Sequence, residues 1–339
     1  MPAAQTTVVT ALVDLGAREG SDRRDGQWYL THCDGILSTQ HALIVFAEPQ
    51  LVDSLREIRN QLAPGAPSRI IGLPFERLPR ARDAVAIQAA FDSGRRPPTA
   101  SNPTKDTPSY IALGWSKPGL VGLVAQINPF NSSMIWWADV ALLHVASPGE
   151  GDTFDGLIGG AQVGLHANVL WEIDPSEYED AENFYRHTPF SKIAGGLFGI
   201  PAESSAEFTT AFNDEVDRCL GAGWPTIDEV LLGVVFDRLR NDTEFSYGPW
   251  ETLLSNFSGL HGAAWHRLRL LRDCMHRNLL ERAGAHINDL RGAQGFGRIQ
   301  LTDNEIAELA DLEDQWRRST RNDPVADTSE NSPDSIARQ

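Results

Sequence analysis

The run from Met134 to Asp139 (MIWWAD) is short, apolar and rich in β-favouring residues, and it ends on a carboxylate. A run of this kind is typical of a central strand that is buried on both faces, as in the sheets of α/β proteins. Open α/β sheets bind their ligands at the carboxyl ends of the strands, where Asp139 would lie. We therefore expect an α/β fold with Asp139 at its functional edge. The alternative is an aspartate that only begins the following loop.

The first half of the chain alternates between strand-like and helix-like segments. The expected strands are Thr7–Leu15, Ala42–Ala47, Ser68–Leu73 and the run that ends at Asp139. The expected helices are Trp28–Leu37, Leu51–Leu62 and Tyr110–Ile127. This alternation predicts a mostly parallel central sheet with right-handed connections, flanked by helices.

The second half is mainly helical. Lys192–Ile200 is expected to be a strand that carries Gly195 and Gly196. The expected helices are Ser204–Leu220, Ile227–Arg240, Ala264–Ala283 and Thr302–Arg318, the last opening on a capping-box pattern. We expect one domain over residues 1–262, a helical C-terminal extension over 263–320 and a disordered tail over 321–339.

The composition limits the partners and the compartment. The chain has 29 Lys and Arg and 46 Asp and Glu, which gives a formal charge of −17. This charge repels nucleic acid and favours a small-molecule or neutral partner. Cys33, Cys219 and Cys274 lack the spacing of a zinc site and fit a reducing compartment. No segment reaches the ~20 apolar residues that span a bilayer. We expect no transmembrane segment and a cytoplasmic protein, and peripheral attachment to a membrane stays open.

Several short motifs occur in a characteristic order along the chain. They are Thr7-Val8-Val9-Thr10-Ala11, Tyr110–Lys117, Asn128-Pro129-Phe130, Trp137-Ala138-Asp139, Gly195-Gly196 and Asp228-Glu229. In this order they resemble the HtrL/YibB family of bacterial proteins, over roughly residues 7–260. That family looks like a set of glycosyltransferases of the GT-A type. The resemblance implies a GT-A-like, Rossmann-like nucleotide-diphospho-sugar transferase fold, with residues 1–262 as the nucleotide-sugar-binding and catalytic domain.

The resemblance also implies a metal site with one departure from the usual pattern. Asp139 occupies the place of the Asp-x-Asp signature, but Ala141 replaces the second carboxylate. Mg²⁺ or Mn²⁺ can still be held by one carboxylate together with substrate phosphates and water. A second protein ligand would be His144 or His261, and cationic side chains are the alternative to a metal.

Four residues are candidates for the nucleotide side of the site. By the resemblance, Thr10 and Ala11 end a strand where the base would lie against backbone groups, and Lys117 would contact the phosphates or the nucleotide. Trp136 and Trp137 face opposite sides of their strand, so one belongs to the core and the other, taken as Trp137, would stack on a base or sugar. An ordinary strand end is the structural alternative for Thr10 and Ala11, and a core position is the alternative for the tryptophan.

The transferring sugar and the acceptor have a second group of candidates. Gly195 and Gly196 permit a ligand to approach the backbone closely, although they could also be packing glycines. The resemblance makes Asp228 a general base or a stabiliser of oxocarbenium-like charge, with Glu229 as the alternate. Both acids are equally explained by the helix that they begin. Weaker candidates are Arg18, Arg23, Arg24, Trp250, Asn256 and His261.

The sequence therefore predicts a glycosyltransferase that moves a sugar from a nucleotide-diphosphate donor to a saccharide, glycolipid or small-molecule acceptor. The alternative is a GT-A-like binding or scaffold protein that has lost catalysis, as Ala141 suggests. A dehydrogenase is disfavoured because no G-x-G-x-x-G follows Thr7–Leu15. A hydrolase of the α/β type is disfavoured because the chain has no G-x-S-x-G elbow.

Overall fold

The chain divides into two compact units, Met1–Arg267 and Leu268–Gln339. The domain boundary expected from the sequence lies between residues 262 and 263, whereas these two units meet between residues 267 and 268. The computed structural model describes residues 6–19, 25–102, 106–146, 154–160, 163–258, 264–296 and 299–321. Except for Arg321, the tail expected over 321–339 lies outside these ranges.

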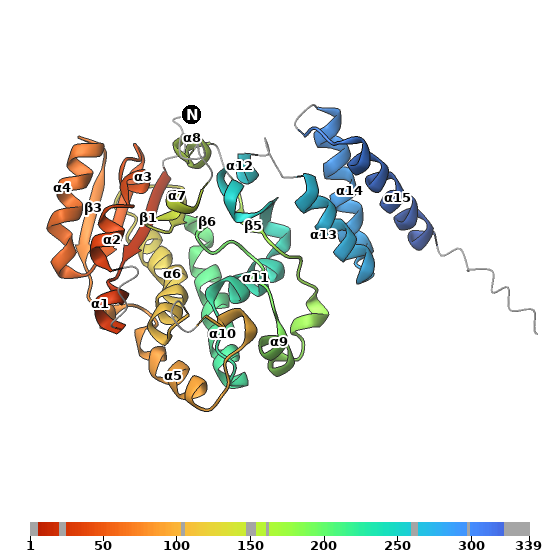
Figure 1. The fold of residues 1–339 in the computed structure, drawn as a ribbon. Coiled ribbons are helices and arrows are strands. Elements are labelled where there is room, and N and C mark those ends of the chain that lie inside the picture. Colours follow the sequence, from red (N-terminus) through yellow and green to blue (C-terminus); the bar gives the residue numbers. More distant parts are fainter. Residues whose placement is uncertain are drawn as a thin grey trace, which may run out of the picture. The chain divides into compact units, whose positions relative to one another are not determined.

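The first unit is built on a seven-stranded sheet of strand order β3-β2-β1-β4-β6-β5-β7 (Figure 1). Its strands are β1 (Thr6–Leu12), β2 (Ala42–Ala47), β3 (Ser68–Gly72), β4 (Met134–Ala138), β5 (Leu165–Val169), β6 (Leu197–Pro201) and β7 (Thr243–Tyr247). Neighbouring strands are parallel except β6, which is antiparallel to both β4 and β5. The predicted mostly parallel α/β sheet is confirmed.

Helices cover both faces of this sheet. They are α1 (Leu15–Glu19), α2 (Gly26–Leu30), α3 (Asp34–Leu37), α4 (Val52–Leu62), α5 (Ala84–Asp92), α6 (Pro108–Ile127), α7 (Leu142–Val145), α8 (Phe154–Gly159), α9 (Ala181–His187), α10 (Ser205–Ala222), α11 (Asp228–Arg238) and α12 (Leu253–Ser258). The helices α6, α10 and α11 pack together on one face (Figure 1). The other face carries α3, α4, α8 and α12, whose apolar side chains share a core with β1, β2 and β4.

The central strands are buried because their side chains are apolar on both faces. Every residue of β1, β2 and β4 is buried. Trp136 packs in the core shared with α12, while Trp137 stacks on Phe198 of β6 at 6.4 Å between ring centroids. Burial on both faces is what the continuous apolar runs predicted.

Several segments differ from the sequence-based expectation. Two short helices, α2 and α3, replace the single helix expected over Trp28–Leu37. Between them, the side chains of Thr31 and His32 form hydrogen bonds with the carbonyl of Trp28. The strand expected over Lys192–Ile200 begins only at Leu197. Strands β5 and β7 were not predicted, because their short runs lie in polar or glycine-rich surroundings.

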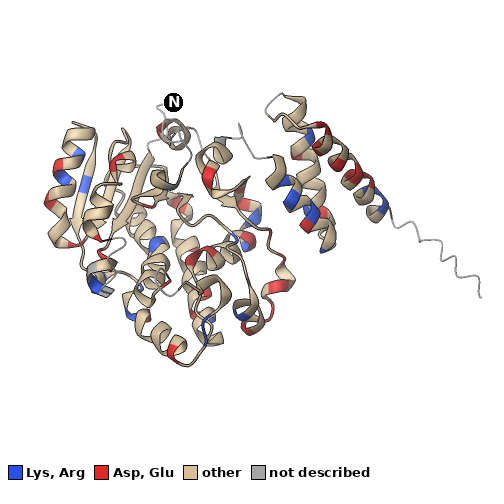
Figure 2. Ribbon diagram, in the orientation of Figure 1, with Lys and Arg blue, Asp and Glu red and all other residues tan. Residues whose placement is uncertain are grey.

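The second unit contains most of α13 (Ala264–His276) together with α14 (Leu280–Gly295) and α15 (Asp303–Thr320). The helix expected over Ala264–Ala283 is broken because Asn278 has a left-handed φ of 57°. Acidic positions are spaced along α15, as the red parts of its ribbon in Figure 2 show, and two of them pair with the other helices of this unit. Arg272 contacts Glu308 at 2.7 Å, and Arg291 contacts Glu313 at 2.9 Å. Helices α14 and α15 lie within the span 263–320, for which the sequence predicts a helical C-terminal extension.

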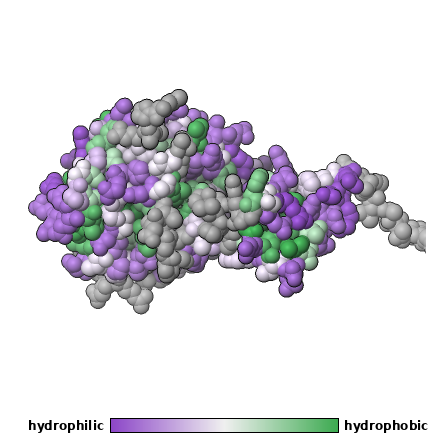
Figure 3. Space-filling view, turned by 90° about the horizontal axis from the view of Figure 1, so that it is seen from above, coloured by the Kyte–Doolittle hydropathy of each residue, from purple (hydrophilic) through white to green (hydrophobic). Residues whose placement is uncertain are grey.

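The surface of the described residues is largely polar. Polar residues cover much of the face drawn in Figure 3, with smaller apolar areas between them. Among the described helices, none combines the length and the apolar character needed to cross a membrane.

Candidate active site

Asp139 lies at the edge of the sheet where the parallel strands end. Because β6 runs against β4, the residues that precede β6 come to the same edge as the residue that follows β4. The backbone N–H of Asp139 donates to the carbonyl of Gly196 at 2.8 Å. The topology thus joins two candidates that are 57 positions apart in the numbering of this chain.

Lys117 connects Asp139 with Asp228. Its Nζ lies 3.0 Å from Asp139 Oδ1 and 2.9 Å from Asp228 Oδ2. The side chains of Lys117 and Asp228 are 9% and 5% exposed, whereas that of Asp139 is 41% exposed. Helix α6, the end of strand β4 and helix α11 each supply one member of this cluster. One cation between two carboxylates leaves a net negative charge, and the accessible part of it lies on Asp139.

The charge of Lys117 is fixed by its neighbours. Burial by itself lowers the pKa of a lysine, but the carboxylates of Asp139 and Asp228 outweigh this effect and raise the pKa of Lys117 well above its usual value. Lys117 therefore stays an ammonium ion and is a donor, never a base. It also donates to the carbonyl of Gly195 at 3.2 Å.

Two glycines make room for the Asp228 carboxylate. A Cβ on Gly195 would lie 2.9 Å from Asp228 Oδ2 and 3.0 Å from Glu229 Cγ. A Cβ on Gly114 of α6 would lie 2.8 Å from Asp228 Oδ1. Gly196 has a different neighbour, since a Cβ there would lie 3.0 Å from the ring of Trp250. Gly195 is thus a close-packing glycine at the candidate acid, and Gly196 is packed beneath an indole.

Trp137 contacts the candidate site through its nitrogen. Its Nε1–H donates to Asp139 Oδ1 at 2.8 Å, so this oxygen accepts from both Trp137 and Lys117. Trp136 and Trp137 are 0% and 2% exposed. Both rings are buried, so Trp137 does not provide the surface for stacking on a base or sugar that the sequence suggested. It orients Asp139 through this hydrogen bond.

Tyr110 belongs to the site and was missed from the sequence. Tyr110, Gly114 and Lys117 share one face of α6, because residues three and four apart are neighbours on a helix. Burial, and then the charges of Asp228, Asp139 and Glu229, raise the pKa of the Tyr110 phenol well above its usual value, although Lys117 opposes them. Tyr110 therefore remains a neutral hydroxyl. The spacing 110, 114 and 117 was the signal that could have found it.

Thr10 and Ala11 lie near the carboxyl end of β1, which ends at Leu12 and is the strand beside β4. Both are buried, and the described residues offer no hydrogen-bond partner for Thr10 Oγ1. Glu229 is half-buried next to Asp228 at the start of α11.

The weaker candidates are dispersed. Arg18 pairs with Glu76, and Asn256 is buried beside Gly248. His144 packs against Trp28 and His32, at 5.0 and 4.5 Å between ring centroids. Arg23, Arg24 and His261 lie outside the described residues.

A divalent cation would find one accessible carboxylate here. Within the described ranges no group of three or more His, Cys, Asp or Glu could hold a metal ion. The side-chain contacts of Asp139 with Trp137 and Lys117 both use Oδ1, and the side chain is 41% exposed. The donor set therefore fits a Mg²⁺ or Mn²⁺ ion that keeps several waters and takes further oxygens from substrate phosphates.

Residues 4–155 match the model of the HtrL/YibB family, described as a bacterial protein of unknown function. The resemblance predicted from the sequence is confirmed for this part of the chain. No curated protein matches the chain.

Two solved structures are similar in outline. Core-mannan synthase A from Aspergillus fumigatus, in an Mn/GDP form, is 8% identical, with 72% of this chain and 73% of that chain covered and a TM-score of 0.44. Mouse xyloside xylosyltransferase 1, in its apo form, is 10% identical, with 71% of this chain and 84% of that chain covered and a TM-score of 0.33. Both scores are too low to assign a function.

Proposed function

We propose that this protein is a nucleotide-sugar-dependent glycosyltransferase that acts at the Lys117–Asp139–Asp228 cluster. The observation that carries the proposal is the ion pairing of Lys117 with two aspartates from different elements at the carboxyl edge of the sheet. This edge is where open α/β sheets bind ligands. A buried, ordered set of charges is costly to build for structure alone, and such sets are common at functional sites.

The donor is proposed to bind along the edge from β1 to β4. Thr10 and Ala11 would face the nucleotide, and Asp139 would hold Mg²⁺ or Mn²⁺ against the diphosphate. When bound, the cation offsets the negative charge that builds on the leaving diphosphate. Trp137 and Lys117 hold Asp139 in one position, which reduces the cost of ordering it when donor binds.

Asp228 is proposed to act on the acceptor or on the transferring sugar. Its carboxylate would accept the proton of the acceptor hydroxyl or stabilise oxocarbenium-like charge, with Glu229 as the alternate. Lys117 is then a positioning residue that holds Asp228 in place through their ion pair. Gly195 and Gly196 contribute as packing glycines, since Asp228 lies against the first and the indole of Trp250 against the second.

The proposal is tested by incubating purified protein with UDP-, GDP- and TDP-sugars in the presence of Mn²⁺. Donor hydrolysis and thermal stabilisation are measured for each. We expect turnover of at least one donor, and a loss of about 100-fold or more in Asp228→Asn, since general-base catalysis is worth about that factor. The matched control is Asp217→Asn, because Asp217 is 69% exposed and pairs with Arg80 outside the site. Folded protein that neither binds nor turns over any donor would refute the proposal.

A binding protein without catalysis is the second candidate. Ala141 in place of the second carboxylate favours it, together with the pairing of Asp139 to Lys117. Asp139→Asn separates the two functions. An enzyme loses turnover in this variant, whereas a binding protein keeps its nucleotide sugar or partner.

A further inference from the structure

Trp171 and Phe190 form an aromatic pair beyond the end of β5. Their ring centroids are 4.7 Å apart with an interplanar angle of 31°. Half of Phe190 is exposed, and Trp171 is partly buried. A phenyl ring that is half exposed and packs at a tilt against an indole presents apolar surface to solvent, and a ligand that covers this surface gains free energy.

Backbone hydrogen bonds join Trp171 to the segment that follows Phe190. The N–H groups of Leu170 and Trp171 both donate to the carbonyl of Lys192, at 2.9 and 3.2 Å. The N–H of Ala194 donates to the carbonyl of Asn168 at 2.9 Å. The end of β5 and the segment from residue 192 to 194 are therefore fastened together. A surface fixed in this way loses little conformational entropy on binding.

The same segment leads directly to the proposed catalytic residues. The N–H of Ile193 donates to the carbonyl of Glu229 at 3.3 Å. Three residues later, the carbonyl of Gly196 accepts from Asp139. The aromatic pair thus flanks the side of the site that carries Asp228 and Glu229, and lies away from the strand ends of β1 and β2.

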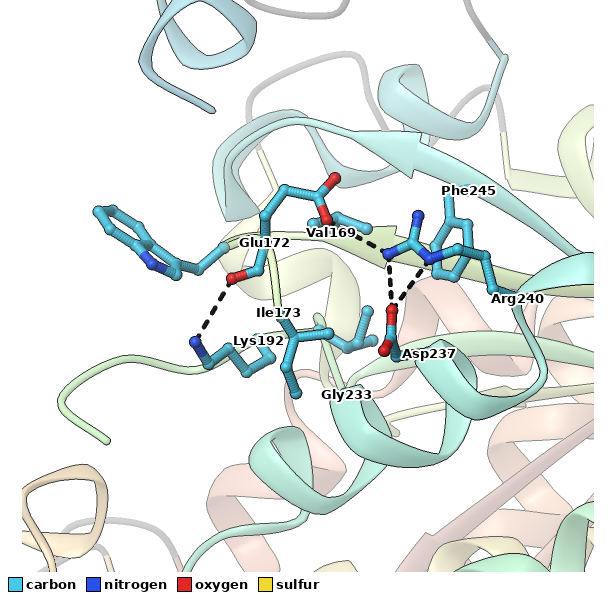
Figure 4. Close-up of a pocket in the computed structure, with 10 residues that line it drawn as sticks. Val169, Glu172, Ile173, Lys192, Gly233, Asp237, Arg240 and Phe245 are labelled. Carbon is cyan, nitrogen blue, oxygen red and sulfur yellow. Dashed lines mark hydrogen bonds and ion pairs between the residues drawn. The ribbon is translucent and has the colours of Figure 1, made fainter. Parts of the chain in front are cut away.

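The charges beneath the pair are largely matched with one another, as Figure 4 shows for Glu172, Asp237 and Arg240. Arg240 contacts Glu172 at 3.2 Å and Asp237 at 2.9 Å. Lys192 contacts Glu177 at 2.9 Å. Two cations face three carboxylates in this group, so it presents no cationic surface for a phosphate or carboxylate ligand. A neutral ligand with one apolar face fits better.

We propose that Trp171 and Phe190 form a subsite for a pyranose ring of a saccharide acceptor. The C–H face of a pyranose is flat and apolar and would be buried against the aromatic pair, while its hydroxyls remain in contact with polar groups and water. The role as acceptor subsite rests on the proposed transferase function. Among the acceptor classes expected from the sequence, this geometry selects a saccharide.

The test observes Trp171 directly in the full chain. The protein is labelled with 5-fluorotryptophan, its ¹⁹F resonances are recorded, and the Trp171 resonance is assigned as the one lost in Trp171→Phe. Methyl pyranosides of glucose, galactose, mannose and N-acetylglucosamine are then titrated without donor. We expect at least one sugar to shift the Trp171 resonance with saturation, and this shift to be lost in Phe190→Ala. Trp265, which is 53% exposed, is the internal control for non-specific contact and should not respond.

Kinetics separate this proposal from the function on which it rests. With an active donor, Phe190→Ala should raise the KM for a saccharide acceptor about tenfold, the effect of losing about 1.4 kcal/mol of binding. Phe296→Ala, which removes a ring that is 79% exposed in the second unit, should leave both this KM and donor hydrolysis unchanged. The subsite is refuted if no pyranoside shifts the Trp171 resonance, if Trp265 responds equally, or if Phe190→Ala binds as the unmodified protein does. A Trp171 response without binding of any nucleotide sugar would refute the transferase function and retain a saccharide site.

Discussion

Among single residues, Lys117 has the contacts that matter most for stability at the site. Lys117→Met would leave Asp228, 5% exposed, without its cation. Breaking a buried pair from one side leaves an uncompensated charge, so we expect the free energy of unfolding to fall by about 3–5 kcal/mol. Urea denaturation of the purified variant measures this loss.

The matched control for Lys117→Met is Arg56→Met. Arg56 lies 3.0 Å from Asp53, but the two side chains are 56% and 95% exposed, so we expect a loss below about 1 kcal/mol. The double variant Lys117→Met/Asp228→Asn should recover part of the stability, because the buried charge is then removed. Equal losses at Lys117 and Arg56, or no recovery in the double variant, would contradict the ion-pair account.

Gly195→Ala should disturb the site more than its volume suggests. The new methyl group would lie 2.9 Å from Asp228 Oδ2, so the carboxylate must move away from Lys117. We expect a loss of about 1–3 kcal/mol in unfolding free energy and a marked loss of transfer activity. Gly221→Ala is the control: a Cβ at this position would have nothing within 4 Å, and alanine in a helix should stabilise by about 0.5–1 kcal/mol. Unchanged activity in Gly195→Ala would argue against a tight fit at Asp228.

The site residues could be predicted from the sequence only where they belong to motifs that occur in a characteristic order along the chain. The sequence pointed to Lys117, Asp139, Asp228 and Gly195, and the fold brings all four together. It could not show that Lys117 is shared between two carboxylates. That arrangement depends on how α6, the end of β4 and α11 meet in three dimensions, which local sequence patterns do not reveal.

At the scale of elements, agreement follows the strength of the local pattern. The apolar run of β2 and the amphipathic helix α4 were found almost to the residue, since their periodicity is unbroken. The segment from residue 192 to 196 was mistaken for strand. Its composition suits a strand, but its backbone bonds go to the end of β5 and to α11. One sequence does not show whether the backbone groups of a segment will bond to a neighbouring strand or to other parts of the fold.

Helix α15 offers a prediction for a single element. The capping box expected from the sequence is present: Thr302 accepts from the N–H of Glu305, and Glu305 accepts from the N–H of Thr302. Thr302→Ala should destabilise the start of α15 by about 1 kcal/mol. Hydrogen exchange of the first-turn amides should become faster, whereas amides of α4 in the other unit should exchange as before. Unchanged exchange at Glu305 and Ile306 would contradict the capping role.

At the scale of the whole molecule, the formal charge of −17 says little about the site, where one lysine is shared between two aspartates. The negative net charge disfavours nucleic acid as a partner, but it does not identify a ligand. The arrangement of buried charges carries that information, and it arises only when the sheet is assembled. Buried titratable groups also set how the fold responds to pH.

His166 of β5 predicts an acid limit for the first unit. It is 5% exposed and stacks on Trp136, and burial lowers its pKa from 6.5 to about 4. Glu244, 3.5 Å away, is 69% exposed, so solvent screens its attraction.

The folded-state pKa of His166 lies below its unfolded value, so the neutral imidazole is favoured by folding. Its contribution to the free energy of unfolding is therefore complete above about pH 6.5 and is lost as the pH falls through about 4. The loss amounts to about 3 kcal/mol at most. Urea unfolding followed from pH 7.5 to 4 should show this decline, on top of changes from other groups. In His166→Leu the decline over this range should be smaller by that amount, because no proton is taken up at this position. The same pH dependence in both proteins would exclude His166 as its source.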